Sequence, residues 1–201
     1  MGISLKVNPF AHEYYESAEL RNFGFRQVGT NVKISKNCTI VGLKNISLGD
    51  HVRVDANTLL IANTGFLEIG SYVHIGANCY LGCAGGIAME NFSGVSHGVM
   101  IFSCGDDYSG RALTNPTIPS HFLNVKLAPV RLKKHSVVGA GSVIMPGVVI
   151  GEGSAVGALS LVTRTLGDWG IYFGSPIKKI MARSRHLLID EERLFKDCNK
   201  Y

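Results

Sequence analysis

A repeat of six residues constrains this chain more than any other feature. From Leu132 onward the sequence divides into units that begin with an aliphatic residue and mostly carry Gly second: LKKHSV, VGAGSV, IMPGVV, IGEGSA and VGALSL. The same phase fits IGSYVH, IGANCY and LGCAGG from residue 69 to 86, and MENFSG, VSHGVM and IFSCGD after two extra residues. A period of six matches neither a helix at about 3.6 residues per turn nor a strand at about 2. It matches a short strand followed by a turn.

The repeat predicts an all-β solenoid. Each aliphatic residue points into a narrow core, and three units form one triangular coil of about eighteen residues, so that stacked coils give a parallel β-helix. Glycine at the second place permits turn dihedral angles that other residues avoid. The alternative is an antiparallel β-sandwich, whose strands recur about every 8–12 residues without a fixed aliphatic-glycine beat. The β-helix is therefore favoured.

Both ends of the chain depart from the repeat. Residues 1–27 include the polar and aromatic stretch FAHEYYESAELRNFG and are expected to be helical or irregular. Residues 184–201 carry apolar residues at helical spacing, which predicts a C-terminal amphipathic helix packed on the coil or on a neighbouring subunit. Residues 28–183 form the predicted β-helix domain, and a loop at residues 105–127 leaves it because the beat is lost there.

Composition limits the classes of function. The chain has a formal net charge of +5, which suits an anionic ligand, but its basic residues are scattered rather than arranged in a stripe. Nucleic-acid binding is therefore not expected. Five cysteines without a CxxC pair are expected to be reduced thiols. No stretch reaches the roughly 18 apolar residues of a membrane span, so a soluble cytoplasmic protein is expected.

The repeats and the segment VGAGSVIMPGVVIGEGSAVGALSLVTRTLGDWGIYFGSPIKKI resemble the hexapeptide-repeat acyltransferases over residues 28–183. Within that family, the chain is most similar to sugar acetyltransferases of cell-surface polysaccharide synthesis and to galactoside and maltose acetyltransferases. The resemblance implies a left-handed β-helix and a homotrimer with active sites between adjacent subunits. It also implies acetyl-CoA as acyl donor and a sugar as acceptor, in the synthesis of lipopolysaccharide O-antigen or capsule.

The resemblance gives the loop a role, because in this family a long loop reaches across a subunit boundary toward the acceptor. Residues 105–127 are rich in polar, aromatic and proline residues, and irregular loops on rigid scaffolds often carry function. We therefore assign contacts with the sugar to Tyr108 and Asn115, together with His97 from the preceding coil. The alternative is an insertion that the solenoid merely tolerates.

Acyl transfer from a thioester needs a base near the nucleophile and donors near the thioester oxygen. In the galactoside and maltose enzymes a histidine begins the loop, whereas the matching position here is Asp106. We expect His74, which closes the unit IGSYVH, to be the general base, with Asp106 or Asp107 of a neighbouring subunit orienting its imidazole. The alternative for His74 is a purely structural hydrogen bond. His135 and His97, both expected to point outward, are the next candidates.

The donor side follows from the family pattern, in which acetyl-CoA lies in the groove between subunits beside the later coils. Small residues there let the pantetheine arm approach the backbone, and basic residues meet the adenosine phosphates. Small residues also suit tight β-helix turns that bind nothing. Trp169 and Tyr172 are expected to cap the end of the solenoid, and stacking on the adenine of the cofactor is the alternative. The positions that match the cofactor site are Ala140, Gly141, Ala158, Thr163, Arg164, Lys178 and Arg183.

Rival functions stay open on this fold. A zinc enzyme like the gamma-class carbonic anhydrases needs a close histidine pair in one coil. His74, His97 and His135 are 23 and 38 residues apart, so no metal site is predicted. A non-catalytic binding or assembly module is the other class. Between acceptors, a sugar hydroxyl is favoured, and the amine of a nucleotide-linked amino sugar is the alternative.

Overall fold

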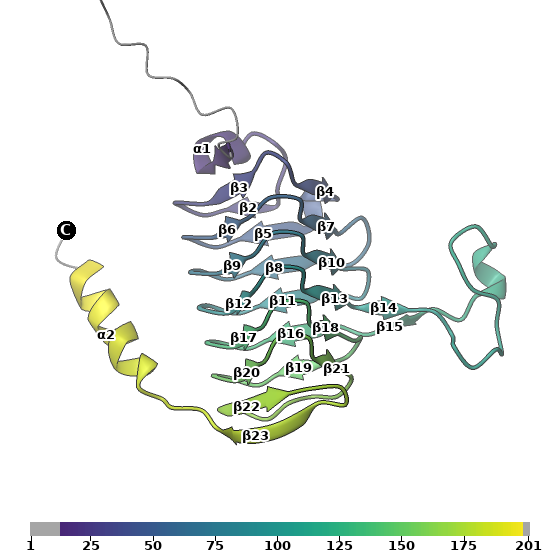
Figure 1. The fold of residues 1–201 in the computed structure, drawn as a ribbon. Coiled ribbons are helices and arrows are strands. Elements are labelled where there is room, and N and C mark those ends of the chain that lie inside the picture. Colours follow the sequence, from purple (N-terminus) through teal and green to yellow (C-terminus); the bar gives the residue numbers. More distant parts are fainter. Residues whose placement is uncertain (1–12, 199–201) are drawn as a thin grey trace, which may run out of the picture.

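The computed structural model describes residues 13–198, which wind into a solenoid of short strands (Figure 1). Each coil contributes one strand to each of three sheets, called here A, C and B in their order along the chain. Strands of successive coils pair in parallel, for example His74 with Gly94 in sheet A and Tyr80 with Met100 in sheet C. The predicted parallel β-helix is therefore confirmed.

Sheet A has nine strands among the described residues, and its two outermost strands run antiparallel to their neighbours. Both ends of this sheet are thus closed by a reversed strand. Its strands are β1 (Tyr14–Glu16), β3 (Lys33–Ser35), β6 (Arg53–Val54), β9 (His74–Ile75), β12 (Gly94–Val95), β17 (Val137–Val138), β20 (Ala155–Val156), β22 (Gly170–Phe173) and β23 (Lys178–Ala182).

Sheets B and C have six strands each in the described part of the chain. Sheet B contains β2 (Gln27–Val28), β5 (Ile46–Leu48), β8 (Leu67–Ile69), β11 (Ile87–Met89), β16 (Val130–Leu132) and β19 (Val149–Ile150). Sheet C contains β4 (Thr39–Val41), β7 (Leu59–Ile61), β10 (Tyr80–Gly82), β13 (Met100–Phe102), β18 (Val143–Ile144) and β21 (Leu161–Val162). A short 3₁₀ turn, η1 (Leu43–Asn45), lies between β4 and β5.

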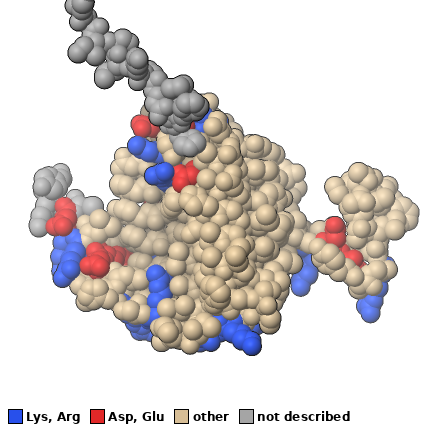
Figure 2. Space-filling model, viewed as in Figure 1, with Lys and Arg blue, Asp and Glu red and all other residues tan. Residues whose placement is uncertain are grey.

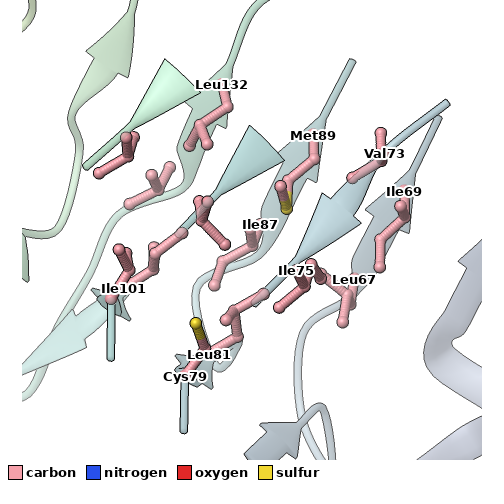
Figure 3. Close-up of a cluster of buried hydrophobic side chains, with 14 of the residues drawn as sticks. Leu67, Ile69, Val73, Ile75, Cys79, Leu81, Ile87, Met89, Ile101 and Leu132 are labelled. Carbon is pink, nitrogen blue, oxygen red and sulfur yellow. The ribbon is translucent and has the colours of Figure 1, made fainter. Parts of the chain in front are cut away.

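The inward positions of the three sheets form one continuous core. In a single coil, Ile75 from sheet A, Leu81 from sheet C and Ile87 from sheet B are all 0% exposed. Equivalent residues of the neighbouring coils stack above and below them (Figure 3). Burying a side chain of this kind contributes about 1.5–3 kcal/mol, so the inward positions hold the fold and leave the outward positions free to carry function.

One corner of the solenoid carries a stack of rings that we call the aromatic ladder: His51, Tyr72, Phe92 and His135. Each of the four sits where the chain passes from sheet B to sheet A, with φ between 56° and 59°. This left-handed backbone repeats once per coil, so the side chains lie above one another. The ring centroids of successive members are 4.6, 4.8 and 5.1 Å apart, a spacing typical of stacked aromatic pairs.

The C-terminal helix α2 (Leu187–Cys198) packs against this ladder on its own chain. Glu191 accepts hydrogen bonds from His135 Nε2 at 2.8 Å and from Lys134 Nζ at 2.6 Å. The ring of Phe195 meets Phe92 edge to face, with centroids 5.9 Å apart. His135 points outward from the coil, as expected, but it is only 7% exposed, because a helix that lies far along the sequence covers it.

The N-terminal segment, expected to be helical or irregular, also contains a strand where the structure describes it. Residues 13–16 include strand β1, which pairs antiparallel with β3, and only one helical turn follows, α1 (Ser17–Leu20). Tyr15 packs its ring edge to face on Phe23 at 4.9 Å. The strand forms because β3 would otherwise leave an unpaired edge at this end of the solenoid. Residues 1–12 of the predicted segment lie outside the described residues.

At the other end, Trp169 and Tyr172 are 9% and 6% exposed within the last coil. The guanidinium of Arg185 lies over the Trp169 ring at 5.1 Å. Tyr172 donates its hydroxyl hydrogen to the carbonyl oxygen of Gly167 at 3.0 Å. These contacts give both aromatic residues the capping role that the sequence predicted.

Candidate active site

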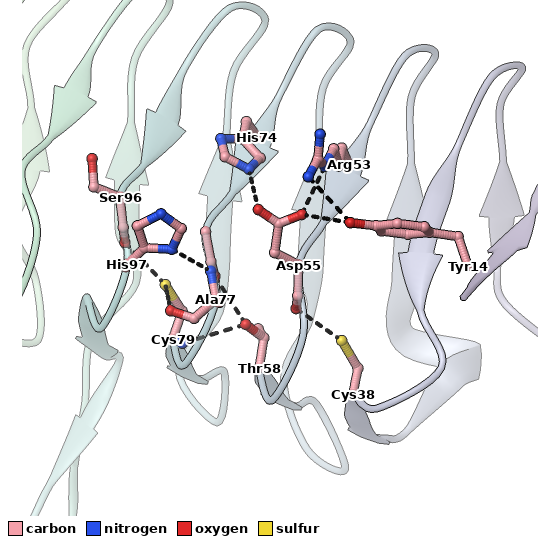
Figure 4. Close-up of polar contacts among 11 residues, drawn as sticks. Tyr14, Cys38, Arg53, Asp55, Thr58, His74, Ala77, Cys79, Ser96 and His97 are labelled. Atoms are coloured by element: carbon pink, nitrogen blue, oxygen red, sulfur yellow. Dashed lines mark hydrogen bonds and ion pairs between the residues drawn. The ribbon is translucent and has the colours of Figure 1, made fainter. Parts of the chain in front are cut away.

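His74 and Arg53 are neighbours on the outward face of sheet A, paired in register between β6 and β9. Asp55 directly follows β6 and is 8% exposed. Its carboxylate oxygen Oδ2 lies 2.8 Å from His74 Nε2, and Oδ1 lies 2.7 Å from Arg53 Nε (Figure 4). Tyr14, from the reversed strand β1, donates its hydroxyl hydrogen to the same Oδ1 at 3.1 Å. Four side chains from three strands of sheet A therefore form one polar cluster.

This cluster keeps Asp55 ionised. Burial would raise the pKa of the Asp55 carboxyl, but the hydrogen bonds from His74 and Arg53 outweigh it and hold the pKa below its ordinary value. An ionised carboxylate only accepts hydrogen bonds, so His74 Nε2 carries the hydrogen that Asp55 accepts. In neutral His74 the other ring nitrogen, Nδ1, then has the free lone pair. The side chain is 51% exposed, so Nδ1 is available as a base.

The carboxylate that orients His74 is thus Asp55 of the same chain, a residue that the sequence analysis missed. A usable signal was present, because Asp55 precedes His74 by 19 residues, which is close to one coil. The predicted orienting residues, Asp106 and Asp107, lie instead on the extruded loop of this chain. Their contact with the His74 of a second subunit stays a prediction.

His97 lies one coil below His74, at the corner between sheets A and C. Its Nδ1 accepts a hydrogen bond from the backbone N–H of Ala77 at 3.0 Å, so in the neutral ring Nε2 carries the hydrogen. His97 is therefore prepared as a hydrogen-bond donor, whereas His74 is prepared as a base. The two histidines differ in role because their partners differ, a carboxylate in one case and an amide in the other.

The same corner continues as a line of small residues that we call the small-residue ridge: Ala140, Gly141 and Ala158. The N–H of Gly141 donates to the carbonyl oxygen of His97 at 2.9 Å, and the N–H of Leu159 donates to that of Ala140 at 2.8 Å. All three ridge residues are solvent-exposed or nearly so. The structure thus brings three predicted cofactor residues into line with His97, and the exposed side chain of Leu159 lies at the same corner, beside Gly141.

The other predicted cofactor residues lie near the end of the solenoid. Thr163 and Arg164 follow β21, and Arg164 Nη2 donates to the carbonyl oxygen of Ile177 at 3.2 Å. Lys178 begins β23 and is exposed. Arg183 is directed elsewhere: its Nη1 donates to the carbonyl oxygens of His135 at 2.8 Å and Gly153 at 3.0 Å, and burial lowers its pKa. It fastens the segment before α2, and its phosphate contact stays a prediction.

The extruded loop stands on a two-stranded antiparallel stem, β14 (Cys104–Gly105) and β15 (Lys126–Leu127), and projects away from the coils (Figure 1). It contains one 3₁₀ turn, η2 (Ser120–Phe122). Asp107 Oδ1 accepts the backbone N–H of Ser109 at 2.8 Å, and Asn115 Oδ1 accepts that of Thr117 at 3.0 Å. Asp106 and Tyr108 are exposed, Tyr108 to 91%. Asp106 and Tyr108 also line a cavity that the loop forms with Tyr80 and Phe102 of sheet C in the same chain.

Within residues 13–198, no group of three or more His, Cys, Asp or Glu side chains is arranged to hold a metal ion. In the same part of the chain, no helix combines the length and the apolar character that crossing a membrane requires.

Comparison with known proteins finds transferases both for the repeats and for almost the whole chain. Residues 129–164 match the bacterial transferase hexapeptide family (six repeats). The chain is 36% identical over 183 residues to the dTDP-4-amino-4,6-dideoxy-D-glucose acyltransferase of Escherichia coli, covering 91% of this chain and 95% of that protein. It is 43% identical over 47 residues, about a quarter of each chain, to a galactoside O-acetyltransferase of Lactococcus lactis.

Among solved structures, AntD superposes with a TM-score of 0.89 at 44% identity, over 94% of this chain and 100% of that one. AntD is an N-acyltransferase from Bacillus cereus whose crystals contain dTDP and 3-hydroxybutyryl-CoA. These likenesses confirm the family and the left-handed β-helix that the repeats predicted. The chain belongs to the hexapeptide-repeat transferases and is an acyltransferase of that family.

Proposed function

We propose that this protein transfers an acyl group from acyl-CoA to the amine of a dTDP-linked amino-deoxy sugar. The sequence favoured a sugar hydroxyl as acceptor, with the amine as the alternative. The relatives that match almost the whole chain act on amino sugars or are N-acyltransferases by name, so they support the alternative. The observation that carries the proposal is the His74–Asp55 pair, which presents a base on sheet A one coil before His97, the residue that adjoins the small-residue ridge.

The chemistry of the pair suits an amine. The amine nitrogen attacks the carbonyl carbon of the thioester, the carbon–sulfur bond breaks, and coenzyme A leaves as a thiolate. The attacking nitrogen must lose a proton as its bond to carbon forms. Nδ1 of His74 accepts that proton and returns it to the leaving sulfur, while Asp55 stabilises the imidazolium that exists between the two steps.

His97 supplies the hydrogen-bond donor that the thioester oxygen needs. As the thioester carbonyl becomes tetrahedral, negative charge gathers on its oxygen, and a positioned hydrogen-bond donor lowers the energy of that state. The hydrogen on His97 Nε2 points away from the Ala77 amide, and His97 adjoins the ridge along which we place the pantetheine arm. A base and a donor from adjacent coils then stand on the two sides of the reacting carbon.

A second subunit completes the binding site for the acceptor sugar. Sheet C presents an apolar outward ladder in register, Leu59, Tyr80, Met100, Val143 and Leu161. Leu59 and Met100 are 38% and 44% exposed, which is costly for an isolated chain. Figure 2 shows that charged side chains on the visible side gather on α2, at the ends of the solenoid and on the loop. The central coils of the solenoid carry few charged side chains on that side.

A ring of three chains buries this ladder. If the three sheet C faces surround an axis, one edge of each sheet meets the opposite edge of the next, as cyclic symmetry requires. One edge of sheet C is the corner with His97 and the ridge, and the other is the corner from which the loop departs. The loop of one subunit, with Asp106 and Tyr108, then reaches the His74 of its neighbour. The exposed Asp106 carboxylate then accepts a hydrogen bond from the substrate's amine and orients its lone pair toward the thioester.

The spacing of two residues supports the role of Asp106. Solved variants of AntD replace one serine and one aspartate that lie ten positions apart. In the present sequence, Ser96 and Asp106 form the one Ser–Asp pair with that separation. Ser96 adjoins His97 on the ridge side, and Asp106 lies on the loop. A site shared by two subunits brings these two residues together.

The test measures thiol release from acyl-CoA with matched acceptors. dTDP-4-amino-4,6-dideoxyglucose is compared with the sugar nucleotide that carries a hydroxyl at the same position. We expect rapid turnover with the amino sugar and at least about a hundredfold less with the hydroxyl, because the hydroxyl is the weaker nucleophile and loses the amine's contact with Asp106. Equal rates, or turnover with the hydroxyl sugar alone, contradict the proposal.

A further inference from the structure

A groove runs along the outward face of sheet A beneath α2, and we call it the α2 groove. Its volume is about 520 Å³, within the roughly 300–1,000 Å³ of small-molecule pockets. His74 stands at one end of it. Its apolar lining consists of Tyr72, Phe92, Val137, Leu187 and Leu194.

The floor of the groove opens directly after His74. In the outward ladder of sheet A, Arg53 pairs with His74, His74 with Gly94, and Gly94 with Val137. Long side chains thus give way to a position with no side chain at all. Three residues beyond Gly94 along the chain is His97, so the floor leads straight to the small-residue ridge. A molecule that lies on the ridge can therefore extend past His74 into the groove.

The wall of the groove is helix α2, and it is firmly attached. Glu191 bonds to both His135 and Lys134, and Phe195 contacts the rings of Tyr72 and Phe92. Charge pairing and aromatic packing hold the helix at two separate points. The space between helix and sheet is therefore a built feature of the fold.

Charge decides what the groove accepts. Two carboxylates from α2, Asp190 and Glu191, line it and pair with Arg193 and Lys134, so these cations are already engaged and are not free to bind the diphosphate of a sugar nucleotide or of coenzyme A. Among the described residues that line it, Arg183 is the one Lys or Arg, and its Nη1 is already bonded to two backbone carbonyls. An uncharged chain of carbon atoms fits this lining, whereas a phosphate does not.

We propose that the α2 groove holds the part of the acyl group beyond the thioester carbonyl, so that the protein transfers an acyl group longer than acetyl. The inference rests on the proposed function, because it takes the reacting carbonyl to lie between His74 and the ridge. It adds that Gly94 and Leu194 set the length of the acyl group. An acetyl group leaves the groove empty, and each methylene that enters it gains apolar contacts.

The test compares butyryl-CoA with acetyl-CoA by their kcat/KM values, with the amino sugar nucleotide as acceptor. For the natural chain we expect butyryl-CoA to be favoured at least about tenfold, since each matched methylene is worth roughly 10-fold or more in a fitted pocket. Gly94→Val fills the floor and lowers that ratio at least about tenfold. The backbone tolerates it, because a Cβ at Gly94 meets only the carbonyl oxygen of His74, at 3.4 Å.

Ala88→Val is the matched control, because Ala88 is an outward residue of β11 on sheet B, and it leaves the ratio unchanged. Leu194→Ala is a second variant that widens the groove, and it raises the value for hexanoyl-CoA relative to butyryl-CoA. A preference for acetyl-CoA in the natural chain overturns the inference and leaves the proposed function intact. The inference is also overturned, with the proposed function intact, if neither Gly94→Val nor Leu194→Ala changes the relative kcat/KM values of the acyl-CoA donors. Absence of transfer from every acyl-CoA overturns both.

Discussion

Sheets A and C share one core but present opposite outward faces. Both send aliphatic residues inward at the same places of the repeat, such as Ile75 in sheet A and Leu81 in sheet C. Outward, sheet A carries Arg53 and His74 at positions paired in register, whereas sheet C carries Leu59 and Tyr80. Helix α2 covers part of sheet A, whereas Leu59 and Met100 on the ladder of sheet C are 38% and 44% exposed.

The difference shows that in a solenoid the inward residues stabilise the fold and the outward residues can carry function. Inward residues are interchangeable apolar groups that fix the coil, so they cannot distinguish one face from another. Outward residues contribute little to the core and can therefore differ between faces at small cost in stability. Sheet A uses this freedom for a polar cluster, and sheet C uses it for an apolar surface that suits another copy of the chain. Substitutions on each face test this division.

The largest expected effect belongs to His74 on sheet A. His74→Gln keeps a polar side chain of similar length but removes the base, so kcat/KM for acyl transfer falls by roughly 10²–10⁴-fold. Steady-state kinetics at several pH values measure the loss. His186→Gln, outside the coils, is the control and retains full activity. A His74→Gln protein with more than about half of the natural rate would mean that sheet A carries no catalytic base.

Asp55→Asn tests whether the carboxylate orients His74. The amide can donate to Nε2, which would place the ring hydrogen on Nδ1 and remove the base. We expect kcat/KM to fall by about a hundredfold, with little change in KM. In the double variant with His74→Gln, the Asp55 substitution causes almost no additional loss, because both act through one imidazole. Full additivity of the two effects would show that Asp55 acts independently of His74.

The apolar face of sheet C is tested by charge. Leu59→Lys with Met100→Lys places two ammonium groups in the proposed interface, and burying them unpaired is unfavourable by several kcal/mol. We expect light scattering to show that the proposed trimer has dissociated, with activity at least about tenfold lower at micromolar concentration. The matched control, Ser47→Lys with Ala88→Lys on the outward face of sheet B, leaves the mass unchanged. A natural chain that is monomeric contradicts the interface.

The smallest effect concerns the attachment of α2 to the ladder. Burial would raise the pKa of Glu191, but the bonds from Lys134 and His135 outweigh it and lower the pKa. The stabilisation is therefore present above the ordinary glutamate pKa of about 4.3 and is lost as pH falls below it. Glu191→Gln should cost about 1–2 kcal/mol near pH 7 and progressively less as the pH falls below about 4, in thermal melts. If Glu191→Gln lowered the free energy of unfolding equally near pH 7 and below about pH 4, the ion pair would be excluded as the source of the stabilisation.

Sequence periodicity was sufficient for the coils and insufficient for contacts between them. The six-residue beat identifies inward residues such as Ile75 because every coil repeats the same geometry. The partnership of Asp55 and His74 depends on which outward residues fall side by side, and coils that contain extra residues shift that alignment. The burial of His135 depends on where α2 returns after many intervening residues. Neither contact has a local signature that a repeat can display.

The reversed strands at the ends of sheet A prevent one solenoid from stacking end to end on another. A parallel β-helix has no natural end, because its last coil offers the next molecule the same strand direction and spacing that hold its own coils together, and amyloid fibrils grow by such stacking. In this protein, β1 and β23 run the other way, so a further coil arriving there meets mismatched hydrogen-bond partners on sheet A. Two short strands thus stop a fold that could otherwise extend into a filament.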